Sequence, residues 1–309
     1  MFMKKLFPFD KFKIPCSFNS SLYVVSLTKD PTDNKVTECY TLEEDKHFFL
    51  KEMIAGKQCS PEKNSRVIND AQTEVCFLRE ALQKKVNSFI VELIGTIDYG
   101  ITNRGIILEL AQCNFNDMYF EKTGNLITHD QFGGHAAYIK FLKHMETFFI
   151  NVLEFLKASS LVYCDWKFDN ILCFHINPKD DPQIKLSDFG SVLSANIATV
   201  NPHNINQLYC SPNLASCQKY ITPQYSDDYK SVSFLFYKLN GKRLPWEIEY
   251  NVQVAGDVTG VLALTTLLKV MDLTKLKFKG LPYWPSDPIF NVLNTSAYYV
   301  LDKRSKISS

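Results

Sequence analysis

The sequence has almost no net charge, no long apolar run and no paired cysteines. Lysine and arginine total 34 and aspartate and glutamate 33, so the formal charge at pH 7 is +1. A charge this small provides no general attraction to nucleic acid or to a membrane surface. We therefore expect no nucleic-acid or membrane partner, and function must come from local sites.

Targeting segments and a cysteine framework are missing as well. No run approaches the ~18–20 apolar residues that a membrane-spanning helix requires. Pro8, Asp10 and Lys11 interrupt the basic N-terminus before an apolar signal core forms. The nine cysteines are scattered without C-x-x-C spacing, which argues against a zinc site or disulfides, and their odd number suits a reducing compartment. We expect a cytoplasmic or nuclear protein that is neither secreted nor membrane-spanning.

What is present is enough chain for a large core. The 309 residues suffice for two modest domains or one bilobal unit, and a hydrophobic content of 46% excludes disorder as the default state. Strand-like runs cover residues 22–28 and the segment that ends in H-F-F-L-K-E-M, and the polar stretch 60–64 predicts a loop. Two further apolar runs lie on either side of a predicted turn at 99–105. Between these pairs of strands, apolar residues with helical spacing predict one helix: Val67, Ala71, Val75, Leu78 and Leu82.

After Glu109 the pattern becomes helical. Residues 137–157 carry a broad apolar stripe, as a core-facing helix does. A second apolar helix at 228–239 should end at Asn240-Gly241, because Pro245 prevents it from continuing. This order indicates an α+β fold, with a small sheet and one helix first and a mainly helical part after it.

Two blocks of polar residues stand out against this background. The stretch L-V-Y-C-D-W-K-F-D-N contains Asp165, Lys167 and Asn170, and K-L-S-D-F-G contains Asp188. Either block alone is typical of an ordinary loop or turn. Together, and in this order, they supply the groups that hold a nucleoside triphosphate with its metals and orient an attacking hydroxyl.

With these blocks the sequence resembles the eukaryotic protein kinase superfamily over most of its length. The family's H-R-D-L-K-x-x-N corresponds to Y-C-D-W-K-F-D-N. The resemblance implies that Asp165 accepts or orients the substrate hydroxyl proton and that Lys167 faces the γ-phosphate of ATP. It also implies that Asn170 and Asp188 bind Mg²⁺, since oxygen ligands suit a hard cation.

The resemblance extends to the nucleotide site and to the lobes. Lys51 occupies the position of the strand lysine, and we favour Glu74 over Glu80 as its helix partner and Lys51 over Lys46 as the lysine. The implied fold is bilobal, with a small sheet-plus-helix N-lobe at about 1–108, a hinge at about 109–112 and a mainly helical C-lobe at about 113–309. Adenine would bind backbone groups of Glu109 and Ala111, with Leu108 behind it and Leu22 above it.

Several positions depart from the family pattern. Pro15, Ser17 and Ser20 stand where the phosphate loop has its three glycines, and Phe49 stands where alanine faces adenine. Ser17 and Ser20 still offer N–H and hydroxyl donors to the phosphates, but proline has no N–H to give. Phe49 either narrows the adenine pocket or turns away from it.

The catalytic and substrate-binding segments depart as well. Cys164 replaces the arginine that neutralises a phosphorylated activation segment. Asn206 stands where a threonine touches Asp165 and Lys167, and its amide can bridge them. In Y-C-S-P-N, the counterpart of A-P-E, Asn213 replaces glutamate, while Asp228 keeps the position that anchors the catalytic loop. The ending G-K-R-L-P-W-E is similar to the casein-kinase-like and vaccinia-related groups.

Three functions remain open on the sequence alone. The first is a serine/threonine protein kinase that uses ATP and Mg²⁺ on a protein substrate, because Lys51, Glu74, Asp165, Lys167, Asn170 and Asp188 are all present. The second is a pseudokinase that binds or scaffolds, which the missing glycines and Phe49 favour. The third is a kinase-fold enzyme that acts on a small molecule. No oligomeric state is predicted.

Overall fold

The computed structural model describes residues 22–26, 36–41, 46–54, 61–98, 103–120, 126, 132–174, 182–200, 205–216, 219–247, 267 and 271–293. The chain divides into two compact units, which we treat separately. The first unit holds residues 1–112 with 172–176 and 185–190, and the second holds the remaining residues. Pro15, Ser17 and Ser20, which the sequence places in the phosphate loop, lie outside the described residues.

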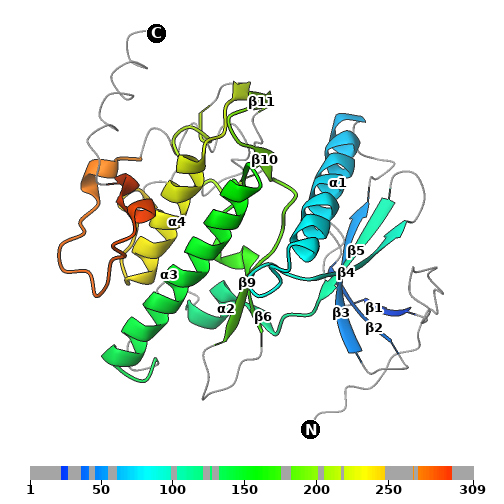
Figure 1. Ribbon diagram of the computed structural model, residues 1–309, viewed down its shortest axis with the longest axis horizontal. Helices are drawn as coiled ribbons and strands as arrows, with labels where there is room; N and C mark the ends of the chain where they lie inside the picture. Colours follow the sequence, from blue (N-terminus) through cyan, green and yellow to red (C-terminus); the bar gives the residue numbers. More distant parts are fainter. Residues whose placement is uncertain are drawn as a thin grey trace. The chain divides into compact units, whose positions relative to one another are not determined.

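The first unit is built on a five-stranded antiparallel sheet in the order β1-β2-β3-β5-β4 (Figure 1). Its strands are β1 (Leu22–Ser26), β2 (Val36–Thr41), β3 (Lys46–Ile54), β4 (Leu93–Asp98) and β5 (Asn103–Glu109). In the register of β3, Lys51 lies opposite Val36 and Ile106, and Phe49 lies opposite Leu108. The expected order of strands and helix is therefore present.

Helix α1 (Pro61–Gln83) packs on β3, β4 and β5 through one buried face. Ala71, Val75 and Leu78 on this face are almost fully buried. The helix begins at Pro61, so the loop predicted for 60–64 is wrong: proline is favoured at the first helical position, where its missing N–H is not needed. Similarly β5 starts at Asn103, inside the predicted turn, because Gly105 pairs with both Glu52 and Ile97.

The second unit is mainly helical. Its long helices are α3 (His135–Ala158) and α4 (Tyr225–Leu239), which lie side by side (Figure 1). Shorter helical segments are α2 (Phe115–Tyr119), η1 (Phe168–Asn170), η2 (Leu273–Lys275) and η3 (Pro288–Leu293). Two small sheets pair β10 (Leu193–Ser194) with β7 (Leu161–Val162) and β11 (Thr199–Val200) with β12 (Tyr220–Ile221). A third sheet has the order β6 (Cys113–Asn114), β8 (Ile171–Phe174), β9 (Gln183–Leu186), and its residues 172–174 and 185–186 belong to the first unit.

Both long helices match their predicted ranges to within three residues at each end. Helix α4 begins at Tyr225 because the Asp227 carboxylate accepts the Gln224 N–H at 2.9 Å, which caps the first turn. It ends before Gly241, whose φ of +72° suits glycine after a helix. The buried Tyr138 hydroxyl of α3 donates to the Leu239 carbonyl at the end of α4, and this bond ties the two helices together.

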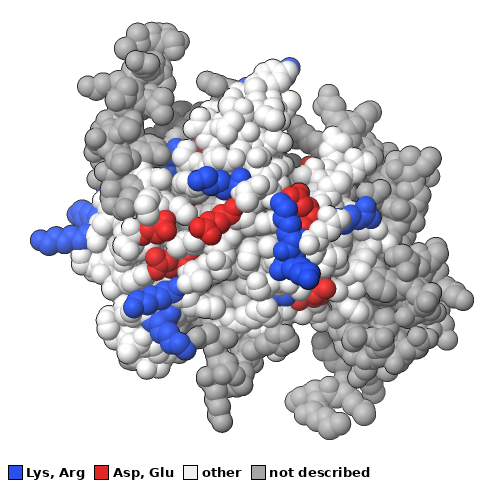
Figure 2. Space-filling model, in the orientation of Figure 1, with Lys and Arg blue, Asp and Glu red and all other residues white. Residues whose placement is uncertain are grey.

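Figure 2 shows basic and acidic side chains interleaved on the face in view, in keeping with the net charge of +1. Within the part of the chain that the structure describes, no helix combines the length and the apolar character that a membrane crossing demands.

Candidate active site

Three charged side chains from distant parts of the chain meet in the first unit. The Lys51 Nζ of β3 lies 2.8 Å from Glu74 Oε2 of α1 and 2.7 Å from Asp188 Oδ1. Glu74 is 0% exposed, whereas the Asp188 side chain is 42% exposed. Burial acts to lower the pKa of Lys51, but the two carboxylates outweigh it and raise the pKa above its usual value. Lys51 is therefore a firmly charged ammonium held between two acids.

The choice of Glu74 over Glu80 agrees with this geometry. Glu80 pairs instead with Lys84, at 2.6 Å and one helical turn away, and both of those side chains are exposed. Such a pair is an ordinary solvated helix contact. The side chain of Lys46, the competing lysine, lies outside the described residues.

The D-F-G block is held against α1 by packing. Phe189 is fully buried and stacks on Phe77, with ring centroids 4.1 Å apart. A Cβ on Gly190 would come within 3.3 Å of the Asp70 Cβ, so the backbone approaches the helix closely at that point. Asp188 itself has a φ of +61°, in the left-handed region that few non-glycine residues adopt. This strained residue is the one whose carboxylate bonds Lys51.

The predicted hinge has an ion pair that the sequence analysis missed. Both carboxylate oxygens of Glu109 bind the buried Lys185 Nζ, at 2.7 and 2.8 Å. Leu108, expected behind adenine, is 3% exposed, and Ala111 is half-buried. The signal that could have revealed the pair is Lys185 itself, since a lysine within the apolar strand I-K-L must find a partner if it is buried.

Two other predicted nucleotide contacts are only partly described. Leu22 lies in β1 opposite Thr41, and its side chain falls outside the described part. Phe49 is half-buried on β3.

The second unit gathers Asp165, Lys167 and Asn170. Lys167 Nζ lies 2.8 Å from Asp165 Oδ2, and the Asn170 Nδ2 lies 3.0 Å from that oxygen and 3.0 Å from the Asp165 carbonyl. Both of these oxygens can only accept, so the amide nitrogen must face them, and the Asn170 Oδ1 points elsewhere. Asp165 and Asn170 are nearly buried, at 4% and 5% exposure.

Long-range hydrogen bonds fix this cluster. The buried Asp228 accepts the N–H groups of Tyr163 at 2.7 Å and Cys164 at 3.0 Å, so it anchors the loop just before Asp165. Burial raises the pKa of Asp228 to about 7. Cys164 has a φ of +70°, and burial raises the pKa of its thiol, which is typical of an unreactive cysteine.

Asn206 contacts Asp165 in a way that the sequence did not indicate. Its backbone N–H donates to Asp165 Oδ1, while its side-chain oxygen accepts the N–H groups of Leu208 and Tyr209, each at 3.1 Å. The predicted bridge through the side-chain amide is therefore corrected to a backbone contact, because the carboxamide oxygen closes a local turn instead.

Asn213 takes part in a hydrogen-bonded network around a buried acid. Its Nδ2 lies 2.7 Å from Asp227 Oδ2, and Ser211 Oγ lies 2.7 Å from Asp227 Oδ1. Asp227 is 1% exposed, so donors from the Y-C-S-P-N block satisfy a carboxylate at the start of α4. The glutamate of the family pattern would instead place a second negative charge here.

Each unit holds one of the two side chains expected to bind magnesium, and both carry an oxygen donor of the kind that Mg²⁺ prefers. No group of three or more His, Cys, Asp or Glu that could hold a metal occurs among the described residues. A magnesium ion that accompanies a nucleotide does not need such a group, because Mg²⁺ is commonly bound by one or two carboxylates plus phosphate oxygens. In the first unit this donor is the half-exposed Asp188 carboxylate, and in the second unit it is Asn170 Oδ1.

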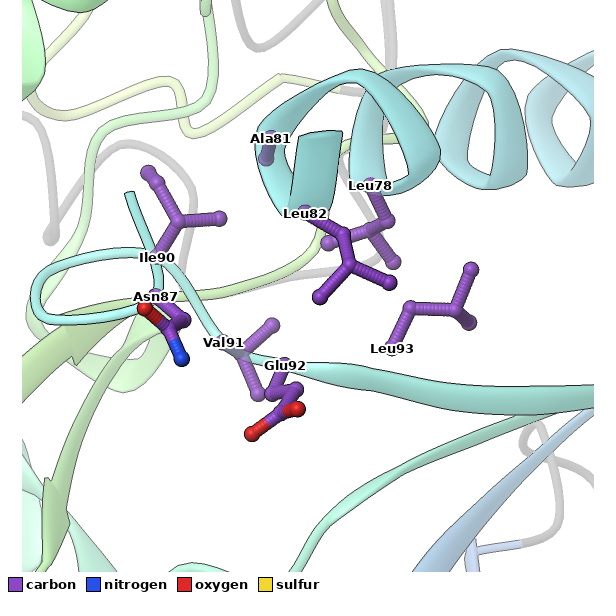
Figure 3. Close-up of a pocket in the computed structure, with 8 residues that line it drawn as sticks. All are labelled: Leu78, Ala81, Leu82, Asn87, Ile90, Val91, Glu92 and Leu93. Atoms are coloured by element: carbon purple, nitrogen blue, oxygen red, sulfur yellow. The ribbon is translucent and has the colours of Figure 1, made fainter. Parts of the chain in front are cut away.

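A surface hollow lies at the end of α1 in the first unit (Figure 3). It is shallow, because its space of about 160 Å³ includes open solvent and leaves no enclosed room for a ligand. It is lined by Leu78, Ala81, Leu82, Asn87, Ile90, Val91, Glu92 and Leu93, none of which is a predicted site residue.

The sequence itself defines the class of protein. The sequence model described as "Protein kinase domain" matches residues 32–285, so the chain belongs to the protein kinase domain family, and the resemblance is confirmed. The chain is also similar to the serine/threonine-protein kinase ATG1 of Debaryomyces hansenii, at 22% identity over 256 residues. That alignment covers 72% of this chain and 27% of the relative, so the chain spans about a quarter of the length of the curated relative it matches.

Proposed function

We propose that the protein is a serine/threonine protein kinase that transfers the γ-phosphoryl group of ATP to a protein hydroxyl. The observation that carries the proposal is the contact of Lys51 with both Glu74 and Asp188, because it joins the nucleotide-binding lysine to a metal-binding acid. Serine/threonine specificity is supported by Lys167, two residues after Asp165, and by the similarity to a serine/threonine-protein kinase.

Each charged residue has a part in the proposed reaction. Asp165 accepts the proton of the substrate hydroxyl, whose oxygen forms a bond to the γ-phosphorus while the bond to the β,γ-bridging oxygen breaks and ADP leaves. Lys167 offsets charge on the transferred group, and Lys51 holds the α and β phosphates. Asn170 and Asp188 would hold Mg²⁺, which neutralises phosphate charge when it is bound.

A label-transfer assay tests the proposal. Purified protein with γ-labelled ATP, Mg²⁺ and a generic basic protein should transfer label. Asp165→Asn should lower the rate by about 10²–10⁴-fold, the usual contribution of a general base. Asp272→Asn is the matched control, because Asp272 is exposed and pairs with Lys275 at 3.9 Å in the same unit. Transfer by neither wild type nor control, or equal transfer by all three proteins, would contradict the proposal.

The second candidate function is a pseudokinase that binds or scaffolds without turnover. Phe49, half-buried on β3 opposite Leu108, is the observation that favours it, because a phenyl ring here competes with adenine for space. A thermal-shift titration separates the two functions. ATP with Mg²⁺ at ~100 times its dissociation constant should add ~2.7 kcal/mol to the free energy of unfolding of a binding protein. The absence of a shift with ATP and Mg²⁺, together with the absence of label transfer, would favour the pseudokinase, because its nucleotide binding is impaired.

A further inference from the structure

Lys185 is a buried lysine that has no role in the proposed phosphoryl transfer. It lies on β9, three residues before Asp188, and its side chain is 6% exposed. Besides the two bonds to Glu109, its Nζ lies 4.9 Å from the centre of the Phe174 ring. Burying an ammonium group is unfavourable unless partners replace the lost water, and here a bidentate carboxylate and an aromatic face do so.

Glu109 is itself fixed to the strand beside it. Its carboxylate accepts the Glu92 N–H at 2.7 Å, and its own N–H donates to the Glu92 carbonyl at 3.1 Å. The Lys185–Glu109 pair therefore joins β9 to the end of β5 and to the residue that enters β4.

The backbone of β9 is held next to the same segment. Leu186, which follows Lys185, accepts the Val91 N–H at 2.9 Å and donates its own N–H to the Phe89 carbonyl at 2.9 Å. These backbone bonds alone do not specify the register, because the N–H and C=O groups are the same at neighbouring residues. A slip of one residue would turn Lys185 to the opposite face and away from Glu109, so the ion pair selects one register.

We propose that Lys185 and Glu109 form a positioning pair that fixes β9, and through it Asp188, relative to the end of β5. An apolar pair could fill the same space without the free-energy cost of removing two charges from water, but it would not specify which residues face each other. The inference rests on the proposed function, in which the end of β5 binds adenine and Asp188 binds the metal. The pair then couples nucleotide-base binding to metal binding within the first unit.

The test compares two equally buried lysines. Lys238 pairs with Glu247 at 2.6 Å in the second unit, with side-chain exposures of 6% and 13%, so Lys238→Met is a matched control for Lys185→Met. ADP affinity is measured for each protein with and without Mg²⁺. In Lys185→Met the gain in affinity that Mg²⁺ provides should fall by about tenfold, a typical coupling between sites. In Lys238→Met the gain should be that of the wild type, although both variants lose thermal stability.

A second readout needs no nucleotide. Hydrogen exchange of the apoprotein should be faster at the Leu186 amide in Lys185→Met than in Lys238→Met, because only the first variant releases β9. Glu109→Gln should reproduce the effect, and the double variant Lys185→Met/Glu109→Gln should add little to either single change.

The outcomes separate this inference from the proposed function. Equal effects of Lys185→Met and Lys238→Met on both the Mg²⁺ gain and the Leu186 exchange would overturn the positioning role. If the wild type binds no ADP, the proposed function fails, and the exchange comparison alone decides whether the pair fixes β9.

Discussion

The two units hold their charged residues in different ways. In the first unit, Lys51 reaches Glu74 across 23 positions and Asp188 across 137, and each residue comes from a different part of the chain. In the second unit, Asp165, Lys167 and Asn170 lie within five positions of one another and bond directly. The fold brings Lys51, Glu74 and Asp188 together from distant parts of the chain. Asp165, Lys167 and Asn170 instead belong to a single loop, which the fold only holds in place.

The difference in burial has a consequence for stability. Glu74 is completely buried, and Lys51 is its cationic partner. In contrast, Lys167 is 27% exposed, and its partner Asp165 also accepts bonds from Asn170 and the Asn206 backbone. Loss of a lysine should therefore destabilise the first unit and leave the second largely intact.

The largest effect is expected from Lys51→Met. It leaves Glu74 buried without its cation, so the free energy of unfolding should fall by about 3–5 kcal/mol, and label transfer should be lost. Lys167→Met, the matched variant in the second unit, should lower kcat with a change in stability below about 1 kcal/mol. Denaturant unfolding and transfer rates measure both. Equal destabilisation by the two variants would remove the contrast between the units.

Asp228→Ala should come next. It leaves the buried N–H groups of Tyr163 and Cys164 without their acceptor, at a total cost of about 1–3 kcal/mol. The rate of transfer should fall as well, because Asp165 follows these two residues. Unfolding by urea measures the stability. A loss of stability no larger than that of a typical surface substitution would show that the cluster of Asp165, Lys167 and Asn170 needs no support from α4.

Because of Asp228, the free energy of unfolding should depend on pH. Its pKa is about 7 in the folded protein and about 3.9 in an unfolded chain. Between these values only the folded state binds the proton, so the free energy of unfolding should fall as pH rises from about 4 to about 7. Asp228→Asn lacks this contribution, so the stability of the wild type relative to Asp228→Asn should be greater at pH 5 than at pH 8. A constant or opposite difference would contradict the raised pKa.

A smaller effect is expected from Asn213→Glu, which restores the residue of the family pattern. The new carboxylate would face Asp227, which is 1% exposed and at present accepts a hydrogen bond from Asn213 at 2.7 Å. Like charges in a desolvated site should cost about 1–3 kcal/mol. Asn213→Ala removes the donor without adding charge and should cost less. If Asn213→Glu were as stable as the wild type, the network would not depend on a donor here.

The smallest effect is expected from Phe49→Ala. If the ring narrows the adenine site, its removal should raise ATP affinity by about 3–10-fold, the scale of one or two methylene-sized contacts. Phe48→Ala is the control, because neighbouring residues on a strand point to opposite faces. Thermal shift with ATP and Mg²⁺ measures both variants. Equal thermal shifts in Phe49→Ala, Phe48→Ala and the wild type would show that Phe49 does not restrict ATP binding.

Sequence reasoning anticipated which residues gather in each of the two clusters. The loop from Asp165 to Asn170 bonds within itself, and the expected Lys51–Glu74 contact is formed. It failed at Pro61, because a proline inside a polar stretch is as compatible with a first helical turn as with a loop. It also misjudged Asn206, because a residue type does not reveal whether its backbone or its side chain makes the contact.

The sequence by itself determined the family and the order of the strands and helices, because these depend on motifs and on apolar periodicity along the chain. Only the tertiary structure decided which buried charges meet. Lys185 meets the charged Glu109, 76 positions away, and the buried Asp227 carboxylate is bound by the neutral amide of Asn213, 14 positions away. A buried charge must find a partner, but its identity depends on which elements pack together.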